Sequence, residues 1–204
     1  MILYLIRHGE STYNAEGRIQ GQSDPELSEL GRRQASAVAR RLADEPIEAV
    51  YASPLRRASQ TAELVAAARN IKLHFDRRLM EVDAGEFGDR MRDEVMRQFP
   101  GAIPQWRSGS LDFVFPGGES RKQLIERGQE AFLEIAKFNH EQVAVASHGG
   151  LLLAAMKAVL GLASDAPPRE LDNASITQLR IEPDGRAELV DFNNVDHLIE
   201  LDPG

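Results

Sequence analysis

The sequence opens with Met1-Ile2-Leu3-Tyr4-Leu5-Ile6 and continues directly into Arg7-His8-Gly9-Glu10-Ser11-Thr12. The first six residues are mostly apolar and rich in β-formers, which predicts a strand buried on both faces, as in a parallel sheet. Gly9 permits a sharp turn, and polar loop or cap residues follow it. Ligands bind outside the carboxyl ends of strands in open parallel sheets, so Arg7 and His8 are predicted to lie in a ligand site.

The composition is that of an ordinary globular protein. The chain has 204 residues, 42% hydrophobic and 27% charged, which suits a single domain over residues 1–204. It has no cysteine, which excludes disulfides and thiolate metal sites. The net charge of −8 argues against a nucleic-acid partner, because binding to a phosphate backbone needs a basic face. No apolar stretch reaches the roughly 18 residues of a membrane span. The N-terminal run also lacks the basic flank and cleavage site of a signal peptide. We therefore expect a cytoplasmic protein without a membrane partner.

Further strands and helices are predicted in alternation along the chain. Strands are expected over residues 47–52, 71–75 and 142–146, and helices over residues 28–43, 53–68, 89–99, 120–136 and 151–160. Ser53 is expected to be an N-cap with Pro54 at the first helical position, which places Arg56 in the first turn. Residues 174–181 and 186–192 are predicted to form a hairpin. Residues from about 84 to 118 have weak periodicity and are interpreted as a cap-like insertion over one end of the sheet.

Polar clusters follow four predicted strands at their carboxyl ends: Arg7-His8, Arg56, Glu81 and His148. Right-handed crossovers turn these ends the same way, so the clusters are expected to converge on one cleft. Arginine binds phosphoryl oxygens through two parallel hydrogen bonds, and a neutral imidazole is a nucleophile toward phosphorus. A protonated carboxyl group can give its proton to a departing alkoxide. The set therefore predicts phosphoryl transfer, with His8 as nucleophile and Glu81 as acid.

The main alternative to phosphoryl transfer is a metal site, because two histidines and a carboxylate can also bind a metal ion. Arg7 adjoins His8, Arg56 is expected nearby, and clustered positive charge repels a divalent cation. We therefore expect no bound metal. The three other histidines have weaker claims, because His74 falls within a strand and the remaining two are interpreted as surface positions.

The motifs that carry these residues resemble, in order, those of the histidine phosphatase superfamily, also called phosphoglycerate-mutase-like. They are Arg7-His8-Gly9-Glu10, Ser53-Pro54-Leu55-Arg56-Arg57-Ala58, Glu81 with Gly85, Pro116-Gly117-Gly118-Glu119-Ser120 and Ser147-His148-Gly149-Gly150. The resemblance covers nearly the whole chain. It implies an α/β fold, a three-layer sandwich with a mainly parallel central sheet, an antiparallel edge strand and helices on both faces.

The resemblance also implies the roles of individual residues. A phosphohistidine would form on His8, and Glu81 would be the general acid. The phosphate pocket would consist of Arg7, Arg56 and His148, with Asn14, Gln20 and Gly149 contributing. Neither a metal nor an organic cofactor is implied. The chain departs from the family at Gly88-Asp89, where many members carry Glu-Gly, so this loop does not indicate the substrate.

These observations favour a metal-independent phosphomonoesterase that hydrolyses a small organic phosphate ester. One alternative is a phosphoglycerate mutase, which returns the phosphoryl group to a bound product. The cofactor-dependent mutases are longer and carry a Glu-Arg pair at the acid position, whereas Glu81 is followed by Val82 here. The other alternative, a non-catalytic phosphate-binding module, would be expected to lack the nucleophile or the acid. The identity of the ester, and whether the protein is a monomer or a homodimer, stay open.

Overall fold

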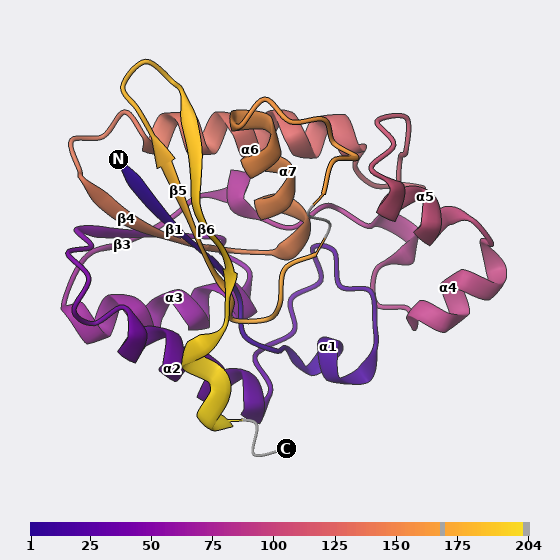
Figure 1. Ribbon diagram of the computed structural model, residues 1–204. Helices are drawn as coiled ribbons and strands as arrows, with labels where there is room; N and C mark the ends of the chain where they lie inside the picture. The colour runs from indigo at the N-terminus through magenta and orange to yellow at the C-terminus, as the bar shows by residue number, and fades with distance from the viewer. Residues whose placement is uncertain (168–169, 202–204) are drawn as a thin grey trace.

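A six-stranded sheet forms the centre of the molecule, in the order β3-β2-β4-β1-β5-β6 (Figure 1). The computed structural model describes residues 1–167 and 170–201. The parallel part consists of β3 (Leu73–Phe75), β2 (Ala49–Ala52), β4 (Gln142–Ser147) and β1 (Ile2–Arg7). An antiparallel hairpin completes the sheet, made of β5 (Ile176–Ile181) and β6 (Ala187–Asn194). The predicted mainly parallel sheet is confirmed, and its antiparallel edge comprises two strands rather than one.

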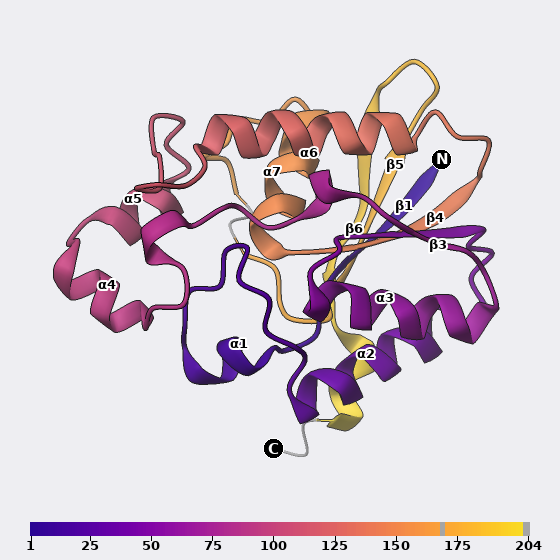
Figure 2. The same cartoon turned by 180° about the vertical axis from the view of Figure 1, so that it is seen from behind.

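Helices cover both faces of the sheet and make three layers (Figures 1 and 2). One face carries α2 (Glu29–Arg41) and α3 (Arg56–Arg69), and the other carries α6 (Arg121–Ile135) and α7 (Gly149–Val159). Side chains alternate along a strand, so β1 contributes to two cores. Leu3 and Leu5 pack with residues of α6 and α7, whereas Tyr4 and Ile6 pack with residues of α2 and α3. The first strand is therefore buried on both faces, as its sequence predicts.

The predicted starts of α2 and α6 are confirmed, whereas the other three differ: α3 begins later, the helix predicted over residues 89–99 begins at Arg92, and α7 begins two residues earlier than predicted. Ser28 caps α2 by accepting a hydrogen bond from the backbone N–H of Gly31, and Ser120 forms a capping box with Gln123 at α6. The prediction for the helix after β2 is wrong: α3 begins two residues later than a Ser53 cap would place it, and Leu55 occupies the cap position. The Ser53 hydroxyl instead lies in the interior, where it accepts from the Leu55 N–H at 3.2 Å.

Residues 84–118 extend the molecule at one end, where α4 (Arg92–Gln98) and α5 (Ala102–Ser108) lie together (Figure 1). The aromatic side chains of this segment pack against one another, and Phe87 and Phe113 are buried in the core. The remaining short elements are α1 (Thr12–Glu16) and the 3₁₀ turns η1 (Arg77–Leu79), η2 (Gly85–Phe87) and η3 (Asp196–Leu201). Within the described ranges, no helix is long and apolar enough to cross a membrane.

Candidate active site

His8 lies just beyond the end of β1, and only 2% of its surface is exposed. The turn that places it requires glycine, because a Cβ atom on Gly9 would lie 2.5 Å from the carbonyl oxygen of Gly31. The His8 Nδ1 atom is 2.6 Å from the Gly9 carbonyl oxygen, which can only accept, so Nδ1 carries the proton. The Nε2 atom therefore presents a lone pair. Burial first, and then the charges of Arg57 and Arg7, lower the pKa of His8 well below its ordinary value and keep the ring neutral.

The arginine beside His8 is Arg57, not Arg56. Its Nε–H donates to His8 Nε2 at 3.2 Å, and its two terminal nitrogens donate to the carbonyl oxygens of Ser23 at 2.7 Å and Gly21 at 2.8 Å. Only 1% of the Arg57 surface is exposed, and burial lowers the pKa of this residue to about 10.

The structure corrects the assignment of Arg56. This residue does lie in the first turn of α3, but its side chain is 54% exposed and pairs with Glu26 at 3.1 Å. Successive residues of a helix point about 100° apart, so only one of two adjacent arginines can face the sheet end. The Asp24 carboxylate accepts from the Arg56 backbone N–H at 2.6 Å and fixes where the helix begins. That start directs Arg57 inward and Arg56 toward solvent.

Two buried nitrogen atoms near His8 have no hydrogen-bond partner, Nε of Arg7 and Nδ1 of His148. The His148 ring lies edge-on to His8 with centroids 5.1 Å apart, and its Nε2 is 2.8 Å from the Ser53 hydroxyl. Burial and nearby arginines lower the pKa of His148 well below its ordinary value. A buried donor without a partner costs about 1–3 kcal/mol. An anion bound between these groups would satisfy both atoms.

Glu81 follows η1, and its carboxylate is held by backbone N–H groups. One oxygen accepts from Gly150 at 3.0 Å, and the other accepts from Val82 at 2.9 Å and Leu151 at 3.1 Å. Two of these donors belong to the first turn of α7, where unpaired N–H groups favour negative charge. A Cβ atom on Gly150 would lie 2.5 Å from a Glu81 oxygen, so a side chain there would displace the carboxylate.

Arg127 of α6 fixes the backbone that leads to Glu81, and sequence reasoning missed it. Its guanidinium pairs with both carboxylate oxygens of Glu119, at 2.7 and 2.9 Å. It also donates to the carbonyl oxygens of Arg78 at 2.7 Å, Met80 at 2.6 Å and Glu81 at 2.9 Å. In the sequence Arg127 is one polar residue of an amphipathic helix, and nothing in its local pattern indicates this contact.

The smaller predicted contributors lie around the same space. Asn14 caps the first turn of α1 with its side-chain oxygen, which accepts from the Ser11 N–H at 3.1 Å. The Gln20 side-chain oxygen accepts from the Ser11 hydroxyl at 2.8 Å. Both amide oxygens are therefore occupied, and the amide NH₂ groups are the ends that can donate to an anion. Gly149 starts α7, and a Cβ atom there would lie 3.4 Å from Arg7 Nε.

These side chains surround one cavity of about 420 Å³. Of the predicted site residues, Arg7, His8, Asn14, Gln20, Glu81 and Gly149 line it, and Arg57 lines it in place of Arg56. His148 is fully buried behind the residues that line the cavity. The segment 84–118 contributes Arg92, Ile103, Trp106, Arg107 and Phe115. Among the residues that the structure describes, no three histidine, aspartate or glutamate side chains come together in the manner of a metal site.

A mainly parallel sheet whose strand ends gather a neutral histidine, two arginines and a helix N-terminus has the groups expected of a phosphoryl-transfer enzyme. The comparison with known families identifies the particular one. The model of the histidine phosphatase superfamily (branch 1) matches residues 3–195, and the chain belongs to this superfamily. It is an enzyme of the histidine phosphatase type, as its motifs predict.

Similar proteins include phosphatases and a mutase-like protein. Phosphoserine phosphatase 1 of Hydrogenobacter thermophilus is 35% identical over 202 residues, which cover 98% of this chain and 95% of the relative. A protein of Salmonella choleraesuis named "Probable phosphoglycerate mutase GpmB" is 36% identical over 87% of this chain and 83% of its own length. The structure of mycobacterial glucosyl-3-phosphoglycerate phosphatase complexed with VO3 is 32% identical with a TM-score of 0.88, covering 95% of this chain and 99% of that chain.

Proposed function

We propose that this protein is a phosphomonoesterase that hydrolyses a small organic phosphate ester, without a metal ion, through a phosphohistidine on His8. One observation carries the proposal. The neutral His8 presents the Nε2 lone pair beside Arg57, in a pocket where Arg7 and His148 hold buried nitrogens without partners. A tetrahedral phosphoryl group supplies acceptor oxygens for these donors and an electrophile for the lone pair.

In the first step His8 Nε2 attacks phosphorus, the N–P bond forms and the bond from phosphorus to the ester oxygen breaks. Arg57 releases Nε2 and, together with Arg7, binds the phosphoryl oxygens as negative charge develops on them. In this mechanism the Ser53 hydroxyl donates to His148 Nε2, which places the ring proton on Nδ1, where it points to the transferring group. The protonated Glu81 carboxyl group gives its proton to the departing alkoxide.

In the second step Glu81, now a carboxylate, takes a proton from water. The resulting hydroxide attacks phosphorus, the N–P bond breaks, and inorganic phosphate and neutral His8 are regenerated. The three backbone N–H groups that hold the carboxylate suit its charged state. The segment 84–118 acts as a cap over the cavity, which its lining residues Trp106 and Arg107 support.

The test is hydrolysis of para-nitrophenyl phosphate in the presence of EDTA, with wild type beside His8→Ala. His140→Ala is the matched control, because His140 lies outside the cavity and contacts Glu48 at the surface. We expect wild type and the control to be active with the chelator and His8→Ala to be inactive. Acid-labile, alkali-stable protein-bound phosphate should be trapped in wild type and in His140→Ala, and not in His8→Ala. Loss of wild-type activity with EDTA, or activity in His8→Ala, contradicts the mechanism.

A phosphoglycerate mutase is the second candidate, supported by the name of the Salmonella relative. A mutase uses the same groups but returns the phosphoryl group to the bound product. Incubation with 3-phosphoglycerate separates the two functions. A phosphatase that accepts this ester releases inorganic phosphate and glycerate, whereas a mutase produces 2-phosphoglycerate without net release of phosphate.

A further inference from the structure

A second cavity of about 320 Å³ adjoins the catalytic one, between α5, α6 and α7. Four residues line both cavities: Trp106, Arg107, Gly150 and Leu153. We call this second space the side chamber. It adjoins the place where the ester oxygen would depart, because Gly150, which lines both cavities, donates its N–H to the Glu81 carboxylate at 3.0 Å.

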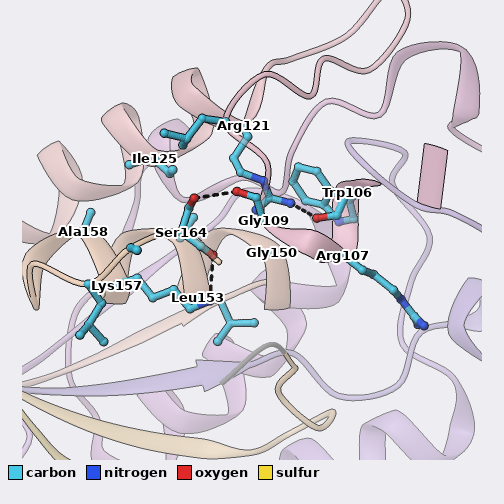
Figure 3. Close-up of a pocket in the computed structure, with 14 residues that line it drawn as sticks. Trp106, Arg107, Gly109, Arg121, Ile125, Gly150, Leu153, Lys157, Ala158 and Ser164 are labelled. Atoms are coloured by element: carbon cyan, nitrogen blue, oxygen red, sulfur yellow. Dashed lines mark hydrogen bonds between the residues drawn. The ribbon is translucent and has the colours of Figure 1, made fainter. Parts of the chain in front are cut away.

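Most polar side chains of the side chamber form hydrogen bonds with its own walls. The Ser164 hydroxyl donates to the Gly109 carbonyl oxygen at 2.6 Å, and Lys157 donates to the Ser164 carbonyl oxygen at 3.1 Å. The buried Arg121 donates to the Trp106 carbonyl oxygen and lies over the Trp106 ring, 3.8 Å from its centroid, while its Nε has no hydrogen-bond partner among the described residues. Figure 3 shows these three hydrogen bonds along the walls, with the Arg107 side chain extending away from the rest.

Apart from the Arg121 Nε, the surfaces left to meet an occupant are mostly apolar. They belong to Trp106, Leu111, Ile125, Leu153, Ala158 and Leu162. Leu111 is 55% exposed and Leu162 is 44% exposed, although both are large apolar residues. A polar ligand would lose its hydration here and find most of the hydrogen-bonding groups engaged, which is unfavourable. An apolar ligand would instead cover these leucines.

We propose that the side chamber binds the alcohol portion of the substrate and that this portion is apolar, an alkyl chain or an aromatic group. This inference rests on the proposed phosphatase function and specifies its substrate class. The phosphoryl group sits at His8, the ester oxygen faces Glu81, and the organic chain runs past Gly150 and Leu153 toward Leu162. A dry cavity of about 150 Å³ holds one benzene ring, so this chamber has room for a chain of about six carbons or a two-ring group.

The test is a series of ethyl, butyl and hexyl phosphates, whose alcohols have nearly equal acidity. Each fully buried methylene group should raise kcat/KM by about fourfold, and we expect at least about a tenfold rise from ethyl to hexyl phosphate. The phosphate ester of diethylene glycol, similar in length to the hexyl ester but polar, should lack this gain. Ala158→Phe places a ring in the side chamber, and we expect kcat/KM to stop rising at a shorter alkyl chain in this variant.

Two further variants make the result specific. Ala67→Phe introduces the same ring on an exposed position of α3 and should leave the whole series unchanged. Leu162→Glu adds a charge at the exposed rim without disturbing a buried site, and should reduce the preference for hexyl phosphate even if Ala158→Phe fails to fold. Equal kcat/KM values for ethyl and hexyl phosphate in wild type, or an unchanged series in Leu162→Glu, overturn the proposal. Failure of the phosphatase function is distinguishable, because wild type then hydrolyses none of the esters.

Discussion

Exchanging each of the two adjacent arginines for glutamine separates the site seen in the structure from the one that the sequence predicts. Arg57→Gln removes the charged donor beside His8 Nε2 and frees the Ser23 and Gly21 carbonyl oxygens. Loss of one preorganised donor to the transition state costs about 2.7–4 kcal/mol, which lowers kcat about 10²–10³-fold. The buried acceptors left without a partner also lower the free energy of unfolding by about 1–3 kcal/mol.

Arg56→Gln is the matched control. It removes only an exposed pairing with Glu26, and such surface pairs contribute about 0–1 kcal/mol. We expect kcat within about twofold of wild type and little change in thermal stability. The assay is steady-state hydrolysis of phenyl phosphate with thermal unfolding of each purified variant. An equal or larger loss of kcat in Arg56→Gln would refute the reasoning, because it would place Arg56 at the transferring group.

Four further outcomes are expected. Glu81→Gln should lose far more kcat with alkyl phosphates than with 2,4-dinitrophenyl phosphate, whose leaving group needs no proton. Arg127→Gln should also lose more kcat with alkyl phosphates than with 2,4-dinitrophenyl phosphate, but by a smaller factor than Glu81→Gln, and Arg127→Lys should recover part of the lost kcat. An equal loss of kcat with both esters would contradict the inference that Arg127 positions Glu81. Gly150→Ala, whose Cβ would lie 2.5 Å from a Glu81 oxygen, should also lose alkyl-ester activity selectively, measured on the same two esters. The folded-state pKa values of His8 and His148 are lowered, so the unfolded chain binds more protons as the pH falls below about 6.5. The free energy of unfolding in urea should therefore be highest above that pH and decrease below it, and a double His→Asn variant should show a shallower decrease; an unchanged slope would exclude these rings as the cause.

The sequence by itself determined the fold class and predicted most of the residues of the candidate site. Apolar runs of strand length followed by polar clusters are local patterns, and a parallel sheet brings their carboxyl ends to one edge whatever the details of packing. This is why Arg7, His8 and Glu81 were found, and why His148 was placed beside them. The order of the motifs along the chain also indicated the family.

The tertiary structure alone decided which arginine meets His8 and what orients the acid. A helix that starts one residue earlier or later turns its side chains by about 100°, and that start depends on Asp24, 32 positions away in the chain. Arg127 reaches the Glu81 backbone across 46 positions. Neither contact produces a recognisable pattern in the sequence, because each depends on how loops and helices distant along the chain pack together. Local composition sets which elements form, whereas packing sets the rotation and the partners of each side chain.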